Sequence, residues 1–487
     1  MNKTTYIILV FCAFTFVRGQ SFNDFLSQLE QSDINARPAL VDSFMNAGHS
    51  FPLIEDSLAH FIYFGDASTI HVPGDFNGWE PNEHIMDRVE GTDFLYLTMQ
   101  FETDARLDYK FVRNMSQWIL DPLNPNTCSG GYGPNSELAM EEYIQPIEIQ
   151  YNGSIPHGQV ESFTFQSTIL NNSRTIYVYT PPNYEDFPNR HFPVMIVNDG
   201  GEYLNLGKMD HILDYLISEE TIDDMVVVFV NPVNRNEEYF MNPDYAQCVV
   251  SEIVPHIQEN YRTLDGSNHW GIMGASLGGL ISVYISHLYP NIFGLCGSHS
   301  GYFPEEIQSL VSSNPNVGTQ FYLDWGTYEQ TILETNIALL SVLQDKGYSI
   351  ETREYHEGHS WGSWRAHTDN ILTLFYPRGT VDIQKKRIKA PNHISINSIF
   401  PNPFNPTTTI QIDLVETWHV GNPIESGATS LHIYDITGRL VETVVNKKMN
   451  PGKHVIQWNA SQYSSGVYYI QLKSNNRVDY KKVLFLK

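Results

Sequence analysis

The feature that most constrains the fold is an alternation of apolar, β-branched segments with helix-like segments over residues 147–377. Seven short segments have the composition of buried strands: 175–179, 192–198, 225–231, 269–273, 294–298, 321–324 and 350–355. Between them lie runs with helical apolar spacing, such as 244–261, 277–289 and 334–346. Apolar strands that alternate with helices predict a mostly parallel sheet covered by helices on both faces.

One turn in this region has the composition of a nucleophile site. The run Gly274-Ala275-Ser276-Leu277-Gly278 lies between the predicted strand 269–273 and a predicted helix that begins at Leu277. Glycines are expected on either side of such a serine, because a sharp strand-to-helix turn crowds the neighbouring elements. The pattern predicts that Ser276 is a nucleophile. The alternative is a glycine-rich turn without chemistry.

A nucleophilic serine needs a base and an acid, which in this kind of fold follow it in the order acid, then histidine. His359 lies in a loop after the last predicted strand and is the expected base, with His356 as the fallback. Glu329, beyond a glycine turn, is the expected acid. Asp324 is the fallback, because it still lies within a predicted strand. The alternative for either histidine is an ordinary surface loop.

Backbone N–H groups are needed to stabilise the oxyanion of an acyl-transfer intermediate. The amide of Leu277, at the start of the helix after the serine, is one candidate. Gly200 and Gly201, after an earlier predicted strand, are the others, since glycine lets backbone amides approach a substrate. A plain turn at Gly200 and Gly201 is an equally good interpretation.

The length and charge of the chain limit its organisation and partners. A chain of 487 residues predicts two to four domains. Its net charge of −26 argues against nucleic acid as a partner, since phosphate binding needs a basic face. Four cysteines are present, of which Cys12 lies in the expected signal, so Cys128, Cys248 and Cys296 allow at most one disulfide and predict no metal cluster.

The segments on either side of residues 147–377 differ from that region in composition and apolar spacing. Residues 1–19 have the lysine and apolar core of a secretory signal peptide, and the apolar run is shorter than the ~20 residues that a membrane anchor needs. Residues 20–51 are helix-like, 52–145 are strand-like, 381–392 form a basic linker and 393–487 are strand-like again. The pattern predicts two small antiparallel β-sandwiches, one on each side of an α/β domain at 146–380.

Residues from about 160 to 377 resemble the esterase family of α/β hydrolases, which includes feruloyl, acetylxylan and enterochelin esterases. The motifs "YTPPNY", "NDGGEY", "GIMGASLGG", "GTYE" and "EGHSWGSWR" carry the resemblance. In that family the acid follows a Gly-x-x-Asp/Glu turn, which the run from Gly326 to Glu329 matches. The resemblance therefore implies an α/β-hydrolase domain and favours Glu329 over Asp324.

Both flanking β regions also resemble known modules, and both are expected to be immunoglobulin-like sandwiches. The motifs "VPGDFNGWEP" and "DYKFVRN" are similar to early-set domains that bind glycogen, which makes Trp79 and Trp118 candidates to stack on sugar rings. Alternatively, Phe76 and Trp79 pack inside the sandwich, and the module shapes the active-site entrance. The motifs "FPNPFNPTTTI" and "YDITGR", with the C-terminal lysine, resemble a type IX secretion sorting domain, which implies export.

Together these features predict a secreted or cell-surface serine esterase that needs no metal or cofactor. Feruloyl or acetyl esters of plant polysaccharides are the expected substrates, and the type IX secretion machinery is the expected partner. Four residues are candidates for substrate binding: Arg235, Trp361, Trp364 and Arg365. An enterochelin-type siderophore esterase is the alternative within this class. The alternative of another class is a non-catalytic glycan-binding protein. No membrane span is expected.

Overall fold

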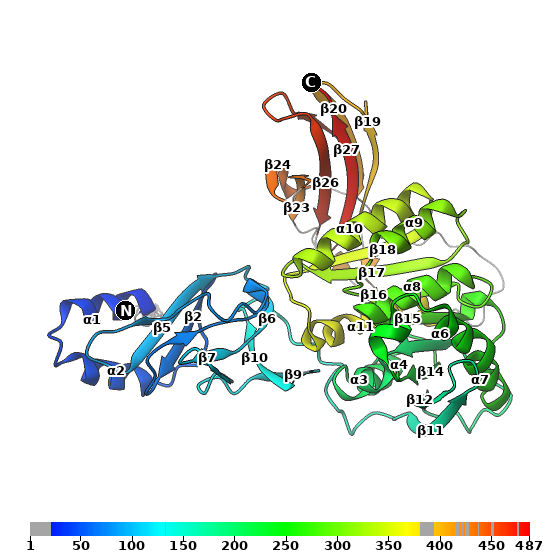
Figure 1. Ribbon diagram of the computed structural model, residues 1–487, viewed down its shortest axis with the longest axis horizontal. Helices are drawn as coiled ribbons and strands as arrows, with labels where there is room; N and C mark the ends of the chain where they lie inside the picture. The colour runs from blue at the N-terminus through cyan, green and yellow to red at the C-terminus, as the bar shows by residue number, and fades with distance from the viewer. Residues whose placement is uncertain are drawn as a thin grey trace, which may run out of the picture. The chain divides into compact units, whose positions relative to one another are not determined.

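A computed structural model describes residues 21–131, 133–379, 394–414, 418–419, 422–423, 428–436, 438–449, 452–474 and 477–487 (Figure 1). The predicted signal peptide, 1–19, and the predicted linker, 381–392, lie outside the described residues. Two compact units alternate along the chain. The first unit comprises residues up to Pro73, with Pro81–Thr103 and Lys110–Pro125, and the second unit comprises Gly74–Glu80, Asp104–Tyr109 and Asn126–Lys487. The predicted β region at 52–145 therefore contributes to both units.

From residue 21 onward, where the structure describes it, the first unit consists of two helices and two small sheets. Its elements are α1 (Phe22–Gln31), α2 (Arg37–Met45), β1 (Leu53–Glu55), β2 (Leu58–Phe64), β3 (Ile70–His71), β4 (Asp87–Arg88), β5 (Phe94–Gln100), β7 (Phe111–Arg113) and β8 (Gln117–Ile119). The sheets have the strand orders β1-β2-β5-β4 and β3-β7-β8. Helix α1 begins at a capping box, in which Ser21 and Asp24 satisfy each other's backbone N–H groups. Its buried residues Phe22, Phe25 and Leu29 follow helical spacing, as predicted.

The second unit begins with short segments that precede the hydrolase region in sequence. They are the 3₁₀ turn Asp75–Asn77, β6 (Arg106–Tyr109), β9 (Thr127–Gly130) and β10 (Gly133–Ala139). The three strands form one antiparallel sheet in the order β6-β10-β9. All four residues of β6 are buried, although two of them are the charged residues Arg106 and Asp108.

The central sheet of the second unit has the predicted mostly parallel arrangement. Its strands are β11 (Gln159–Ser167), β12 (Asn172–Thr180), β13 (Val194–Asn198), β14 (Val226–Val230), β15 (Trp270–Ala275), β16 (Leu295–His299), β17 (Gln320–Gly326) and β18 (Ser349–Tyr355). Their order is β11-β12-β14-β13-β15-β16-β17-β18. Strand β12 pairs antiparallel with both of its neighbours, β11 and β14, and the remaining pairs, from β14 to β18, are parallel. The seven predicted strands are all present, and β11 is an eighth.

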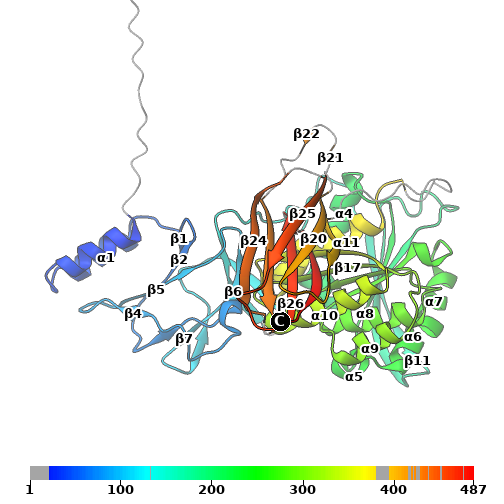
Figure 2. The same ribbon diagram turned by 90° about the horizontal axis from the view of Figure 1, so that it is seen from above.

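Helices cover both faces of this sheet (Figure 2). They are α3 (Gly200–Asn205), α4 (Met209–Ser218), α5 (Arg235–Tyr239), α6 (Pro243–Cys248), the π-helical turn Val249–Ile253, α7 (Val254–Asn260), α8 (Leu277–Leu288), α9 (Glu305–Ser313), α10 (Gln330–Asp345) and α11 (Trp361–Phe375). Alternate residues of β13 enter opposite cores: Val194 and Ile196 pack with α5–α10, whereas Met195 and Val197 pack with α3, α4 and α11. Burial on both faces explains why these strands are apolar throughout.

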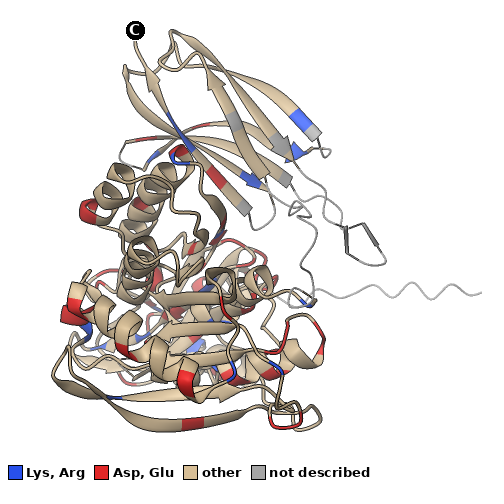
Figure 3. Ribbon diagram, turned by 90° about the vertical axis from the view of Figure 1, so that its right-hand side faces the viewer, with Lys and Arg blue, Asp and Glu red and all other residues tan. Residues whose placement is uncertain are grey.

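The C-terminal region is β-rich, as predicted. Its strands are β19 (Ile394–Phe400), β20 (Thr407–Leu414), β21 (Trp418–His419), β22 (Asn422–Pro423), β23 (Ala428–Asp435), β24 (Leu440–Lys448), β25 (Gly452–Asn459), β26 (Gly466–Ser474) and β27 (Arg477–Phe485). Strands β27-β26-β23-β24 continue the central sheet beyond β18. Asp and Glu residues, red in Figure 3, are spread over the helices of the α/β region. Across the described ranges, we find no helix long and apolar enough to span a membrane.

Candidate active site

Ser276 occupies a strained turn between β15 and α8. Its backbone angles, φ 57° and ψ −120°, lie in a region that residues other than glycine rarely adopt. Its N–H donates to the carbonyl oxygen of His299 at 2.9 Å. A Cβ on Gly274 would lie 2.5 Å from the carbonyl carbon of Gly278, so the strand and the helix approach each other too closely for any side chain there. The spacing of the glycines around Ser276 therefore has a steric cause.

Glu329 and His359 are joined by a hydrogen bond. Glu329 follows β17 and is the N-cap residue of α10, and His359 lies between β18 and α11. Nδ1 of His359 lies 2.9 Å from Oε1 of Glu329. The glutamate side chain is 1% exposed, whereas that of the histidine is 38% exposed. This carboxylate is thus buried behind an imidazole that remains accessible to solvent.

The loops that carry these two residues are bonded to each other. The N–H of Thr327 donates to the carbonyl of Tyr355 at 2.8 Å, and Oε2 of Glu329 accepts the N–H of Gly326 at 3.0 Å. A Cβ on Gly326 would lie 2.0 Å from the carbonyl oxygen of Glu357, so only glycine fits between the loops. These contacts fix the position of the Glu329 carboxylate relative to the segment that holds the imidazole.

The two fallback residues have other partners. Asp324, in β17, lies 2.8 Å from Nδ1 of His299, and both side chains are buried. His356 pairs with Asp104, while its Nε2 lies 3.1 Å from Nζ of Lys473. Asp324 and His356 are therefore not part of the Glu329–His359 pair.

The oxyanion candidates lie at the N-termini of two helices. Leu277 is the first residue of α8, while Gly200 and Gly201 are the first two of α3. The N–H of Gly201 donates to Oδ1 of Asn231 at 2.6 Å and is therefore engaged within the protein. A Cβ on Gly200 would lie 2.3 Å from the backbone of Phe229, so this glycine is required for close packing of α3 on β14.

Arg235 is held by an aspartate beside the serine turn. Its Nε and Nη2 donate to the two carboxylate oxygens of Asp199 at 2.8 and 2.7 Å, and Nη2 also lies 3.2 Å from the carbonyl of Ala275. Burial raises the pKa of Asp199, although the bonded guanidinium opposes the shift. A Cβ on Gly278 would lie 2.9 Å from Oδ2 of Asp199. The aspartate thus packs directly against the serine turn.

The remaining substrate-binding candidates belong to α11. Trp361 and Trp364 are largely buried and pack edge-to-face on each other, with ring centroids 4.9 Å apart. Trp364 also contacts the His359 ring edge-to-face at 4.9 Å. Arg365 lies 3.7 Å from Oε2 of Glu137 and is 17% exposed. Of these four residues, Trp364 is the one that contacts the candidate base.

Sequence reasoning missed two residues that the structure brings into this region. His299, the partner of Asp324, also accepts the N–H of Ser276 through its carbonyl oxygen. Arg106 lies in a segment far upstream and donates to Oγ of Ser360, next to His359. No local motif marks either residue, because both act through contacts between distant parts of the chain.

The three remaining cysteines are free and buried. Burial raises the pKa of the Cys248 thiol to about 11 and that of the Cys296 thiol to about 12. Thiols with such pKa values carry almost no thiolate near neutral pH. These two cysteines are therefore poor competitors for the role of nucleophile. Across the ranges that the structure describes, we find no group of three His, Cys, Asp or Glu residues arranged to hold a metal ion.

Parts of this chain are similar to known protein families and proteins. Residues 167–374 match the family model described as "Putative esterase", and residues 398–486 match that of the secretion system C-terminal sorting domain. Iron(III) enterobactin esterase of Escherichia coli O6:H1 is 24% identical over 331 residues, which cover 60% of this chain and 82% of that protein. An endo-1,4-beta-xylanase/feruloyl esterase of Xylanibacter ruminicola is 28% identical over 173 residues, which cover 32% of this chain and 24% of that protein.

A solved structure has the same fold. The ferric enterobactin esterase of Salmonella typhimurium aligns with a TM-score of 0.59 and 21% identity, over 65% of this chain and 93% of that one. The predicted α/β-hydrolase region of the esterase family and the predicted sorting domain are both confirmed, and a sorting domain of this kind indicates secretion or surface attachment. The chain thus carries, at 167–374, a domain of the putative esterase family and, at 398–486, a secretion system C-terminal sorting domain.

Proposed function

We propose that this protein is a secreted serine carboxylic-ester hydrolase whose catalytic triad is Ser276, His359 and Glu329. One observation carries the proposal: the buried Glu329 carboxylate is bonded to the accessible His359 imidazole. Ser276, Glu329 and His359 follow β15, β17 and β18, so all three lie at the carboxyl edge of one parallel sheet. That edge is where ligands bind in open α/β folds.

In the proposed mechanism, Glu329 accepts a hydrogen bond from Nδ1–H of His359, which leaves Nε2 of the ring unprotonated. Nε2 takes the proton of the Ser276 hydroxyl as Oγ attacks the ester carbonyl. The imidazolium then protonates the departing alcohol. A water molecule, deprotonated by Nε2, hydrolyses the acyl-enzyme in the second half of the reaction. Glu329 orients the ring and stabilises its positive charge in both halves.

The amide of Leu277 is the first oxyanion donor in this proposal, because it opens α8 directly after the serine. The start of α3 supplies the second donor. Between its two glycines we favour Gly200, since the N–H of Gly201 already donates to Asn231. Two such donors stabilise the negative charge that develops on the carbonyl oxygen.

Feruloyl or acetyl esters of plant polysaccharides are the proposed substrates. The best basic candidates for a trianionic siderophore, Arg235 and Arg365, are each paired with a carboxylate of the protein, Asp199 or Glu137. The net charge of −26 also disfavours polyanionic substrates. Trp118 is 47% exposed and is a candidate to stack on sugar, whereas Trp79 donates its Nε1–H to Asp75.

Enterobactin-type siderophore hydrolysis is the second candidate function. It is favoured by the extent of similarity, since the enterobactin esterase of Escherichia coli O6:H1 aligns over 82% of its own length. We further propose that both β-rich regions are immunoglobulin-like sandwiches, that residues 1–19 are a signal peptide and that the type IX secretion machinery recognises the sorting domain.

An ester panel on the full chain tests the proposal. The panel contains methyl ferulate, acetylated xylan and ferric enterobactin, and each substrate is offered to the wild type and to Ser276→Ala. We expect ferulate or acetate release that the variant abolishes, together with fluorophosphonate labelling of the wild type alone. Hydrolysis that persists in Ser276→Ala would refute the mechanism. Turnover of ferric enterobactin alone would select the second function, and tight glycan binding without any turnover would select a non-catalytic role.

A further inference from the structure

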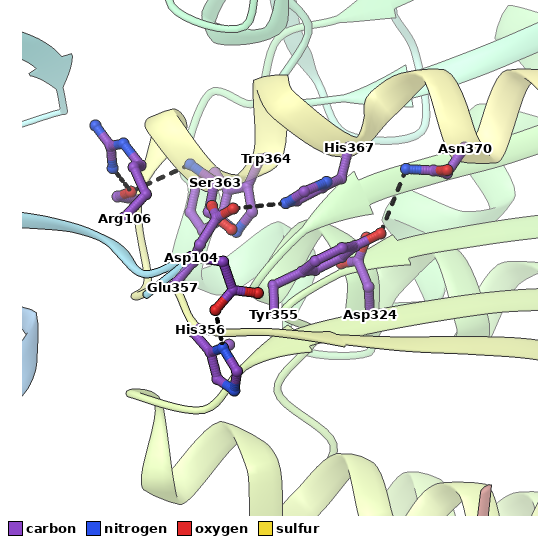
Figure 4. A network of polar contacts seen from close by, with 12 residues as sticks. Asp104, Arg106, Asp324, Tyr355, His356, Glu357, Ser363, Trp364, His367 and Asn370 are labelled. Atoms are coloured by element: carbon purple, nitrogen blue, oxygen red, sulfur yellow. Dashed lines mark hydrogen bonds and ion pairs between the residues drawn. The ribbon is translucent and has the colours of Figure 1, made fainter. Parts of the chain in front are cut away.

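The segment around His359 is contacted by residues that lie about 250 positions earlier in the chain. The backbone N–H of Arg106, in β6, donates to the carbonyl of His356 at 3.0 Å, and Arg106 and Glu357 form an isolated parallel bridge. Nη1 of Arg106 donates to Oγ of Ser360 at 3.0 Å. Figure 4 shows Arg106 beside the first turn of α11, the helix that follows the candidate base. One arginine thus contacts the chain on both sides of His359.

The guanidinium of Arg106 is fully buried and paired with two carboxylates. Its Nε and Nη2 donate to Oε2 of Glu137 at 3.0 and 2.6 Å, and Nη1 lies 2.7 Å from Oδ1 of Asp108. Ser360, which Nη1 also contacts, is the N-cap residue of α11 and accepts the N–H of Ser363. A cation is normally disfavoured at a helix N-terminus. The two carboxylates compensate for that cost and hold the side chain in one orientation.

Two glycines near His359 leave room for these upstream residues. A Cβ on Gly362 would lie 2.1 Å from Cζ of Arg106, and a Cβ on Gly358 would lie 2.1 Å from Cγ of Asp75. The buried Asp75 accepts the N–H of Asp108 at 2.8 Å and that of the Trp79 indole at 3.0 Å. The backbone before His359 therefore packs on Asp75, and the backbone after it packs on Arg106.

We propose that Arg106 and Asp75 are positioning residues that hold the His359 loop in the geometry needed for catalysis. The proposal rests on the role of His359 as the general base in the proposed function. The imidazole is 38% exposed, so its own packing restrains it only partly, and Glu329 fixes one ring nitrogen alone. A displacement of about 1 Å in a catalytic group can lower a rate by about 10²-fold. Backbone anchors on both sides of His359 prevent such a displacement.

The test compares kcat and KM for p-nitrophenyl acetate in variants of the full chain. In Arg106→Ala we expect kcat to fall by about 10²-fold with KM within twofold of the wild type, because the base is displaced while the serine turn is untouched. Gly362→Ala leaves Arg106 and its two carboxylate partners in the sequence but inserts a methyl group that displaces the guanidinium, so we expect kcat to fall by about tenfold. Adding Gly362→Ala to Arg106→Ala should cost nothing further, because the clash has been removed.

A matched control separates positioning from general stability. Arg174 is also a buried arginine with a carboxylate partner, Glu238, but it lies in β12. Arg174→Ala should lower the melting temperature and leave kcat unchanged at temperatures well below that melting point. Equal losses of kcat in Arg106→Ala and Arg174→Ala would overturn the proposal. So would an unchanged kcat in Gly362→Ala, which remains informative if Arg106→Ala fails to fold. Wild-type activity in Ser276→Ala would instead refute the triad.

Discussion

The carboxylate of Asp324 lies 2.8 Å from Nδ1 of His299, its cross-strand partner on β16. Asp324 is an alternative to Glu329 as the acid of the triad, because each of the two carboxylates bonds a histidine. Of these two carboxylates, Glu329 is the one that bonds His359, in the loop after β18. The two carboxylates therefore lead to different expectations when each is neutralised.

We expect Glu329→Gln to lower kcat/KM by about 10²–10⁴-fold, because the amide cannot stabilise the imidazolium that forms during turnover. Asp324→Asn should lower kcat/KM less than tenfold and should lower the melting temperature more, since His299 loses its buried partner. Hydrolysis of methyl ferulate and thermal unfolding of both variants check this prediction. A larger kinetic loss in Asp324→Asn would assign the acid to Asp324.

Strain at Ser276 predicts an unusual order of stabilities. Its φ of 57° and ψ of −120° cost about 1–3 kcal/mol for a residue with a side chain, whereas glycine adopts such angles freely. The extra chain entropy that glycine loses on folding offsets about 0.5–1 kcal/mol of that gain. We therefore expect Ser276→Gly to be more stable than Ser276→Ala by about 1 kcal/mol, with neither variant active. Urea unfolding of the two variants measures the difference, and a less stable glycine variant would contradict it.

Asp75 predicts a specific pH dependence of stability. Burial raises the pKa of Asp75 to about 7, the Asp108 carboxylate adds to the rise, and hydrogen bonds from Asp108 and Trp79 and the charge of Arg106 oppose it. Because the folded state then binds this proton more tightly than the unfolded state, the contribution of Asp75 favours folding below pH 4. That contribution is lost as pH rises from about 4 to about 7.

Replacement of Asp75 by Asn removes the titrating group. The difference in unfolding free energy between wild type and Asp75→Asn should therefore change with pH, by up to about 1.4 kcal/mol per pH unit between pH 4 and 7. The wild type should lose stability relative to the variant as pH rises through this window. Urea unfolding at pH 5, 6, 7 and 8 provides the measurement. Parallel curves for the two proteins would show that Asp75 does not titrate there.

Arg235 can be tested as a structural or a substrate-binding residue. Because its guanidinium is committed to Asp199 and to the carbonyl of Ala275, we expect Arg235→Met to slow neutral and anionic esters by the same factor. The variant should lose about 1–3 kcal/mol of stability, less than the about 3–5 kcal/mol for a fully buried pair, since the arginine side chain is 34% exposed. A selective loss for anionic esters would show that Arg235 binds substrate.

Much of the α/β region could be predicted because its signals are local. Strand β14 reads Val-Val-Val-Phe-Val and is buried at every position, so its composition alone indicates a central strand. The glycines around Ser276 signal a crowded turn in the same local way. Glu329 could be preferred over Asp324 because a turn separates it from its strand, and it is the residue that bonds His359.

The rest could not be predicted, because it depends on contacts between distant residues. The pairing of His299 with Asp324 is set by the register of β16 on β17, which no local pattern encodes. The contact of Arg365 with Glu137 likewise joins α11 to a strand far upstream, which no local pattern encodes.

The sequence by itself determined the class of fold, the export-type C-terminal domain and a short set of candidate catalytic residues. Apolar periodicity and glycine placement are properties of adjacent residues, so they can be read along the chain. Only the tertiary structure decided which carboxylate bonds which histidine, and that Arg106 and Asp75 pack against the segment around His359. Those pairings join residues from about 25 to more than 280 positions apart, and they exist only once the sheet and its loops have assembled.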